Sequence, residues 1–386
     1  MLLNIDRKCD FCGQPLMGAP YYPRNTKRGM EVHICDKCGL IQSFSTKIYL
    51  SNPPPSMSCD ADRASIRYTK DLIIDRHMQQ IESKIKLQFV KSVLDIGSNR
   101  GAFIKKLIAI NAEVKIDAIE PEPNISQFLG QHPQVTEHIT RFEFTDLSTN
   151  SYDFIYLAHT LEHLISASAS LLNIFNLLVT GGSVFIAVPN MDSIASPYFE
   201  EQFIDTHTYH FTEKLLINKL KSIGFNVVSL TLAGSDEICI LANKGSKIEL
   251  ESEKVNPDSL IQAFRAYSNN LSMHREELRE IGANINSTFS STQVIFWGAG
   301  RIFDGLIKIG EVNTEIIKCV VDKTLSSYMK QVNGVEIHPP SALRDVDRIT
   351  PIVVCSREYA EQIKSEATTL GFKNVRHFAE FTLRDI

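Results

Sequence analysis

Residues 92–103, SVLDIGSNRGAF, carry the pattern around which the chain is organised. The apolar run VLDI ends at Gly97, which predicts a buried strand followed by a turn. From Ala102 the apolar residues recur at helical spacing, so we expect a helix directly after Gly101. Glycines let a backbone approach a ligand closely, and a helix that starts there directs free N–H groups toward it. The stretch therefore predicts a ligand-binding turn between a strand and a helix.

Three further segments extend this pattern. A second predicted strand, residues 114–119, ends at Glu120, about 20 residues beyond the glycines, where an acid can accept hydrogen bonds from the hydroxyls of a ribose. Residues 151–164, SYDFIYLAHTLEHL, and residues 177–190, LLVTGGSVFIAVPN, each contain another apolar run. The expected fold is α/β, with these runs as neighbouring strands of one sheet.

The order of these signals resembles a class I S-adenosylmethionine-dependent methyltransferase. The glycine spacing after Asp95 is G-x-x-x-G, which differs from the dinucleotide pattern G-x-G-x-x-G. The resemblance implies a Rossmann-like core over residues 92–246 that binds S-adenosylmethionine. For His163, in the LEHL segment, both contact with the ligand and packing against the sheet remain open. The residues that the resemblance places around the cofactor are Asp95, Gly97, Ser98, Gly101, Glu120, Pro121 and His159.

Composition limits the classes of partner. With 386 residues the chain is long enough for two or three domains, and 43% apolar with 22% charged residues is ordinary for a soluble globular protein. The net charge of −5 provides no basic field for nucleic acid. No apolar run approaches the roughly 18 residues that cross a bilayer, and residues 1–6 lack the features of a signal peptide. We expect a cytoplasmic protein that binds neither nucleic acid nor membrane.

Four of the eight cysteines form two C-x-x-C-G motifs, at Cys9 and Cys12 and at Cys35 and Cys38. Each motif is a tight turn that can direct two thiolates at one ion, and two such turns supply the four ligands of a tetrahedral Zn²⁺. Unrelated thiols and a redox dithiol are the alternatives, and His33 is a possible substitute ligand. Because four thiolates leave no open coordination position, we expect a structural zinc that replaces a core in a module over residues 1–50.

The N-terminal region carries a second resemblance. The segments CGQPL at 12–16 and HICDKCGLIQ at 33–42 are similar to the zinc-binding module of the sugar C-methyltransferase family. Members of that family join a zinc module, a methyltransferase core and a C-terminal Rossmann-like domain, and they methylate nucleotide-linked deoxysugars at carbon. For this chain the resemblance implies a small-molecule partner of the nucleotide-linked sugar class.

The remaining segments complete the expected domain organisation. SNPPPSMS at 51–58 is a linker because its prolines fix φ and remove hydrogen-bond donors, and helical periodicity follows within 51–91. A charged helical connector is expected over 247–290. A C-terminal Rossmann-like domain is expected over 291–386, from a strand that runs into further glycines.

That C-terminal turn has its own pattern. Gly298 and Gly300 follow the strand, and a second strand ends at Asp322. The dinucleotide pattern calls for a third glycine at position 303, where Phe303 stands. Contact with the nucleotide of a substrate, NAD binding and a purely structural role all remain open for this domain.

The candidate catalytic residues are His207 and His210, in the loop before a predicted helix for which Thr212 is the expected N-cap. Methyl transfer requires removal of a proton from the acceptor. The resembled family has His-Glu-His and then a tyrosine in this loop, whereas here Asp205 and Thr206 precede His207, so only the last histidine is retained. Oxygen or nitrogen methylation is therefore the alternative to carbon methylation, and a non-catalytic or NAD-binding protein is the alternative to an enzyme.

Overall fold

The computed structural model describes residues 7–16, 30–45, 70–123, 132–193, 203, 207–233, 235–245, 257–327, 329–357 and 359–382. These residues divide into two compact units, one up to residue 265 and one from residue 266 onward. The proposed linker at 51–58 and the loop residues Asp205 and Thr206 lie outside the described residues. In the described part of the chain, no helix combines the length and apolar character needed to cross a membrane.

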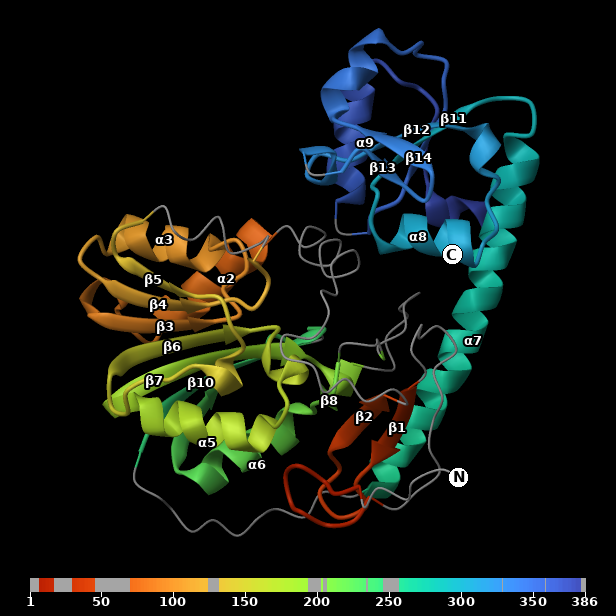
Figure 1. Cartoon of the computed structure of the whole chain (residues 1–386). Coiled ribbons are helices and arrows are strands. Elements are labelled where there is room, and N and C mark those ends of the chain that lie inside the picture. Colours follow the sequence, from red (N-terminus) through yellow and green to blue (C-terminus); the bar gives the residue numbers. More distant parts are fainter. Residues whose placement is uncertain are drawn as a thin grey trace. The chain divides into compact units, whose positions relative to one another are not determined.

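The first unit is built on a seven-stranded sheet in the order β5-β4-β3-β6-β7-β10-β9 (Figure 1). Strands β5 to β7 are parallel to one another, β10 is antiparallel to β7, and β9 is antiparallel to β10. In sequence order the sheet begins with β3 at its centre, then adds β4 and β5 on one side and β6 and β7 on the other. Ligands are expected where the strand order reverses, at the carboxyl ends of β3 and its neighbours. The strands are β3 (Ser92–Ile96), β4 (Lys115–Ile119), β5 (Val135–His138), β6 (Tyr152–Ala158), β7 (Leu178–Pro189), β9 (Phe225–Ser229) and β10 (Glu237–Lys244).

Helices cover both faces of this sheet, so its central strands are buried on both sides. Val93 packs with α2 and α3, whereas its neighbour Leu94 belongs to the core under α5 and α6. This is why the central strands read as continuous apolar runs instead of alternating ones. The fold class expected from the sequence, α/β with a Rossmann-like core, is confirmed. The helices are α2 (Lys70–Glu82), α3 (Ala102–Ile110), α5 (Ala167–Leu177) and α6 (Glu213–Ile223), with 3-10 turns η1 (Leu87–Phe89), η2 (Phe142–Phe144), η3 (Leu161–His163) and η4 (Met191–Ser193).

The N-terminal cysteine module contributes a small three-stranded sheet. Strands β1 (Met30–Ile34) and β2 (Ile41–Ser45) form an antiparallel hairpin. The third strand, β8 (Tyr209–His210), comes from the loop after β7 and pairs with β2. The module is also anchored to the start of α5, because the Asp10 carboxylate accepts hydrogen bonds from the Ser166 hydroxyl at 2.6 Å and the Ser168 N–H at 2.7 Å. The module and the candidate catalytic loop therefore share one sheet.

The second unit contains a six-stranded sheet in the order β13-β14-β12-β11-β15-β16. All neighbours are parallel except β13, which is antiparallel to β14. The long helix α7 (Pro257–Thr288), expected as a connector, packs Leu278, Ile281 and Ile285 into this core. The other elements are β11 (Val294–Trp297), α8 (Arg301–Lys308), η5 (Thr314–Ile316), β12 (Ile317–Val321), η6 (Leu325–Ser327), β13 (Gln331–Val332), β14 (Val335–His338), η7 (Pro340–Asp345), β15 (Ile352–Val354), α9 (Ala360–Thr369), β16 (Val375–His377) and η8 (Phe378–Phe381).

Candidate active site and cysteine cluster

The first glycine turn links β3 to α3 in a conformation that requires glycine. Gly97 has φ of 78° and Gly101 has φ of 70°, both in the left-handed region. A Cβ on Gly97 would lie 2.1 Å from Oγ1 of Thr160, which comes from the loop after β6. The N–H groups of Gly97 and Ser98 donate to the Ile119 carbonyl at 2.9 and 3.0 Å. The turn is thus held between the ends of β4 and β6.

Glu120 lies beside this turn and is buried. Its Oε2 accepts a hydrogen bond from the Asn99 N–H at 2.9 Å, and its Oε1 accepts one from the Glu122 N–H at 3.0 Å. Each carboxylate oxygen can accept a second hydrogen bond. Asp95 is buried at the end of β3, and the Ser98 hydroxyl donates to the Asp95 carbonyl at 2.8 Å. Pro121 follows Glu120 and is partly exposed, so the expected cofactor residues of this edge lie together.

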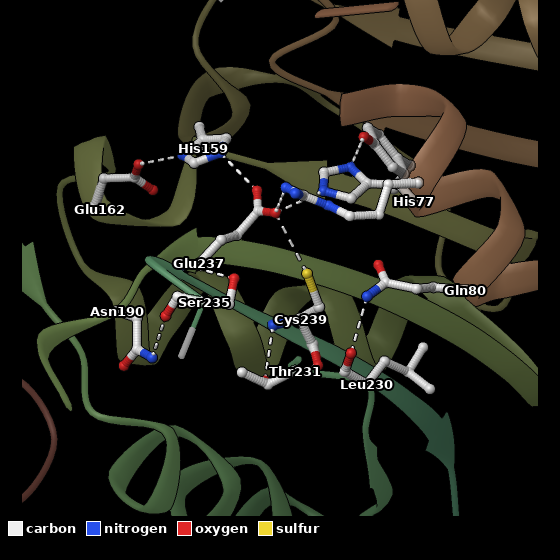
Figure 2. Close-up of polar contacts among 12 residues, drawn as sticks. His77, Gln80, His159, Glu162, Asn190, Leu230, Thr231, Ser235, Glu237 and Cys239 are labelled. Carbon is white, nitrogen blue, oxygen red and sulfur yellow. Dashed lines mark hydrogen bonds and ion pairs between the residues drawn. The ribbon is translucent and has the colours of Figure 1, made fainter. Parts of the chain in front are cut away.

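His159 stands at the end of β6 with a positive φ of 50°. Its Nε2 lies 2.7 Å from Oε1 of Glu237, and its Nδ1 lies 3.7 Å from Oε1 of Glu162 (Figure 2). Burial lowers the pKa of His159, but the carboxylates of Glu162 and Glu237 outweigh burial and raise its pKa to about 9. His159 is therefore a cation at neutral pH.

Glu237 is the centre of a buried polar network that the sequence did not reveal (Figure 2). Besides His159, its carboxylate accepts hydrogen bonds from Arg76 at 2.8 Å and from Nε2 of His77 at 3.0 Å. Nδ1 of His77 lies 2.7 Å from the Tyr156 hydroxyl, so neutral His77 donates to Glu237 and accepts from Tyr156. Burial raises the pKa of Glu237, but its bonds to His159 and His77 outweigh burial and hold that pKa well below its usual range. The only local signal is an acid at the head of an apolar run, which many solvated acids share.

The loop after β7 brings His207 next to η3. The Thr208 N–H donates to the Glu162 carbonyl at 2.8 Å, which ties this loop to η3. The rings of His163 and His207 are 4.8 Å apart between centroids. One ligand atom each from Glu162, His163 and His207 lies within 4.8 Å of the others. The side chain of His163 therefore joins those of Glu162 and His207 at the carboxyl end of β6.

His210 has a different environment from His207. It lies in β8, is 4% exposed, and its Nε2 is 2.6 Å from the Ser43 hydroxyl of β2. Its ring contacts the ring of Phe203 with centroids 4.4 Å apart. Burial, together with the charge of His163, lowers the pKa of His210 to about 3, so it is neutral at physiological pH.

The helix after this loop is capped differently from the expectation. Thr212 occupies the N-cap position of α6, but its side chain makes no capping hydrogen bond. The Glu213 N–H instead donates to the Asp192 carboxylate, in η4, at 2.9 Å. Since η4 is brought here by the fold and not by local sequence, an expectation from residues 212–213 alone could not include it.

The four cysteines of the N-terminal module converge. The Sγ atoms of Cys9 and Cys38 are 3.4 Å apart, those of Cys12 and Cys35 are 3.6 Å apart, and all four lie within 4.8 Å of one another. Ligands about 2.3 Å from a tetrahedral Zn²⁺ lie roughly 3.8 Å from each other. The spacing of this cysteine cluster therefore fits zinc. His33 is buried near Arg7 and Glu31 and is not part of the cluster.

The second glycine turn follows β11. Gly298 has φ of 111°, and a Cβ there would lie 2.8 Å from the Cys355 carbonyl oxygen. Asp322 is engaged by its own unit, because one carboxylate oxygen accepts the Ala299 N–H at 3.0 Å. The other oxygen accepts the N–H groups of Thr324 and Leu325 at 2.9 and 2.8 Å.

Phe303, where the dinucleotide pattern has glycine, is fully buried in the core of the second unit. Its ring centroid is 5.4 Å from that of Phe296. Phe303, which stands where the dinucleotide pattern has glycine, is therefore a packing residue of this domain's core.

Comparison with known proteins supports the class of the first unit. Residues 67–230 match the family model described as a methyltransferase domain. No curated protein sequence matches the chain.

Solved structures of similar fold include two S-adenosylmethionine-dependent methyltransferases. The one from Archaeoglobus fulgidus is 17% identical, with 48% of this chain and 100% of that chain covered and a TM-score of 0.38. The one from Aquifex aeolicus is 16% identical, with 48% and 97% covered and a TM-score of 0.39. Human N-acetylserotonin methyltransferase is 18% identical, with 50% and 60% covered and a TM-score of 0.38.

The strand order, the glycine turn and the domain match define an enzyme with a class I methyltransferase core. The first unit therefore contains a methyltransferase domain.

Proposed function

We propose that this methyltransferase acts on a nucleotide-linked sugar or glycan precursor, with histidine-assisted removal of a proton from the acceptor. The observation that carries the mechanism is the convergence of Glu162, His163 and His207 within 4.8 Å. The loop that bears two of them begins at Thr160, which contacts Gly97 of the glycine turn. The histidines therefore lie on the same edge of the sheet as the proposed cofactor residues.

The glycine turn is the proposed binding site of S-adenosylmethionine. Asp95 and Gly97 to Gly101 would hold the amino-acid part of the cofactor, while Glu120 would accept hydrogen bonds from the ribose hydroxyls. His159 and Pro121 would line the same pocket. The cofactor supplies the methyl group, and the protein aligns the acceptor with the methyl carbon so that displacement from sulfur occurs in line.

His207 is the proposed proton acceptor of the two candidate histidines. His210 is buried, its Nε2 is 2.6 Å from the Ser43 hydroxyl, and its pKa of about 3 makes it a weak base. These contacts suit His210 to holding the loop against β2. His207 belongs to the cluster with Glu162 and His163, at the end of the sheet where the acceptor must reach the methyl group.

The cysteine cluster is the proposed site of a structural Zn²⁺. Four converging thiolates fill a tetrahedral ion, so the metal would fold the module and take no part in the chemistry. Because β2 pairs with β8, the folded module would fix the loop that carries His207. The resemblance to sugar C-methyltransferases favours a nucleotide-linked sugar as acceptor, and the free thiols of the cluster suit a cytoplasmic location. Oxygen or nitrogen methylation of another small molecule remains the alternative.

The experiment is a panel of nucleotide sugars assayed with S-adenosylmethionine carrying a ¹³C-labelled methyl group. We expect label in at least one nucleotide sugar, and NMR then shows whether carbon or oxygen carries it. A His207→Ala variant should lose transfer, whereas His138→Ala, a histidine of β5 outside the cluster, should retain it. Bound S-adenosylmethionine without transfer to any nucleotide sugar would contradict the acceptor class.

A further inference from the structure

The carboxylate of Glu162 is buried without a hydrogen-bond donor. Glu162 is 1% exposed, and within the described residues neither of its carboxylate oxygens accepts a hydrogen bond. The nearest imidazole nitrogens are Nδ1 of His159 at 3.7 Å and Nε2 of His163 at 3.8 Å, both measured to the same oxygen. A buried carboxylate is costly unless it is fully compensated, and the His159 cation at 3.7 Å offsets its charge without a hydrogen bond, so the carboxylate keeps acceptor capacity for a second positive partner.

The surrounding atoms have the composition of a metal site. Two imidazoles, from His163 and His207, and one carboxylate, from Glu162, lie within 4.8 Å of one another. Ligand atoms about 2.1 Å from one ion are roughly 3.0–3.5 Å apart, so movements of several tenths of an ångström to about one ångström would assemble the site. These three ligands leave further coordination positions open.

His159 lies beside this cluster and supports it without belonging to it. Its Nδ1 faces Glu162, while its Nε2 lies 2.7 Å from the Glu237 carboxylate (Figure 2). Groups outside a ligand set commonly fix the orientation of the ligands. Glu237 is itself fixed by Arg76 and His77. His159 therefore holds the Glu162 carboxylate in place next to His163.

We propose that Glu162, His163 and His207 bind a divalent first-row transition metal ion. Imidazole and carboxylate ligands suit Mn²⁺, Fe²⁺, Co²⁺ or Zn²⁺. The four thiolates of the N-terminal module are softer ligands, which favour Zn²⁺ over Mn²⁺. This inference deepens the proposed function and rests on it in one respect, namely that the acceptor reaches this edge of the sheet. It revises one assignment of the proposed function, because His207 would hold the ion, and the ion, not His207, would promote loss of the acceptor proton.

The ion would bind an oxygen of the acceptor and lower the pKa of an attached hydroxyl. The hydroxyl proton leaves to solvent, and the oxygen forms a bond to the methyl carbon. The methyl–sulfur bond breaks with its electron pair on sulfur, which yields S-adenosylhomocysteine. The substrate class is therefore a molecule that presents an oxygen at the reacting centre.

The test uses the full-length protein loaded with a single Zn²⁺ per chain, which the four thiolates hold, and titrates it with MnCl₂ while free Mn²⁺ is counted by electron paramagnetic resonance. Mn²⁺ prefers oxygen and nitrogen ligands, so it reports the proposed site and not the cysteine cluster. We expect one Mn²⁺ per chain with zinc content unchanged. Glu162→Gln and His207→Ala should weaken Mn²⁺ binding by at least about 10-fold. The matched controls Glu113→Gln, at an exposed position, and His138→Ala should bind as the unchanged protein does.

Binding of S-adenosylmethionine, measured by calorimetry on the same samples, shows that each variant is folded. Absence of Mn²⁺ binding, or equal affinity in the unchanged protein and Glu162→Gln, would overturn the metal site. Either result would leave the acceptor class to the nucleotide-sugar assay. Conversely, Mn²⁺ binding that depends on Glu162, without transfer to any nucleotide sugar, would support the metal site and reject only the sugar.

Discussion

In the main sheet of each unit, a glycine turn follows the first strand in sequence and an acid follows the second, yet the two acids have different surroundings. Within the described residues, Glu120 accepts the N–H groups of Asn99 and Glu122, and Asn99 belongs to the glycine turn itself. Asp322 accepts three, from Ala299, Thr324 and Leu325. Asp322 uses both carboxylate oxygens to hold its own turn, whereas Glu120 is the residue proposed to bind the cofactor ribose. If that proposal holds, the same local pattern serves binding in one unit and stability in the other.

The largest expected effect is the difference between alanine substitutions at a glycine of the first turn and at a glycine of the second turn. Gly97→Ala should abolish S-adenosylmethionine binding, because alanine is strained at φ of 78° and its Cβ would lie 2.1 Å from Thr160. Gly300→Ala should be nearly neutral, within about 0.5 kcal/mol, since Gly300 has φ of −76° and no atom within 4 Å of the added Cβ. Calorimetric titration and thermal unfolding measure both. Undiminished cofactor binding by Gly97→Ala would remove the first turn from the site.

A second pair of variants tests the two acids. Glu120→Gln should weaken S-adenosylmethionine binding by about 10-fold, the loss of a hydrogen bond to a charged group. Asp322→Asn should leave that affinity unchanged and lower the stability of the second unit by about 1–2 kcal/mol, because an amide nitrogen would face backbone N–H groups. Titration calorimetry and urea unfolding separate the two effects. A cofactor affinity that falls equally in both variants would contradict the division of roles.

The free energy of unfolding of the first unit should depend on pH more strongly than that of the second unit, because the first unit contains the buried Glu237 network. The pKa of Glu237 is lowered from 4.5, so its contribution is present above pH 4.5 and is lost on acidification. The pKa of His159 is raised from 6.5 to about 9, so its contribution is present below pH 6.5 and is lost as the pH rises through 9. The network therefore stabilises most between pH 4.5 and 6.5.

Glu237→Gln should flatten this dependence, which thermal unfolding across pH without added divalent cations measures. As the matched control, Glu336→Gln, at an exposed position of β14, should keep the dependence of the unchanged protein. An identical pH profile for Glu237→Gln and the unchanged protein would show that the charges of Glu237 and His159 do not contribute to the pH dependence of stability.

The smallest effect is spectroscopic and concerns the second turn. Trp297, the single tryptophan of the chain, is buried directly before Gly298. Its fluorescence should not change with S-adenosylmethionine. A change on adding a nucleoside diphosphate would show that the second turn also binds a nucleotide, whereas no change would support a structural turn.

Sequence alone predicted the features that depend on neighbours along the chain. The strand, glycine turn and helix at 92–110 follow from apolar spacing and from the conformations that glycine permits, and the structure has β3 and α3 there. The approach of the two thiols within each C-x-x-C-G motif also follows from local sequence, because each turn closes through a bond such as Gly13 N–H to the Cys9 carbonyl at 2.8 Å.

Only the tertiary structure decided which distant residues meet. The pairing of β2 with β8, the contact of Thr160 with Gly97, and the meeting of His77, His159 and Glu237 join segments from 63 to 169 residues apart in sequence. Such contacts depend on which strands become neighbours and on what the core excludes from water, and a single sequence shows neither by its local periodicity. The sequence therefore predicted the glycine turn and named His163 and His207 as candidates, whereas the burial of Glu162 and the meeting of Glu162 with His207 came only from the fold.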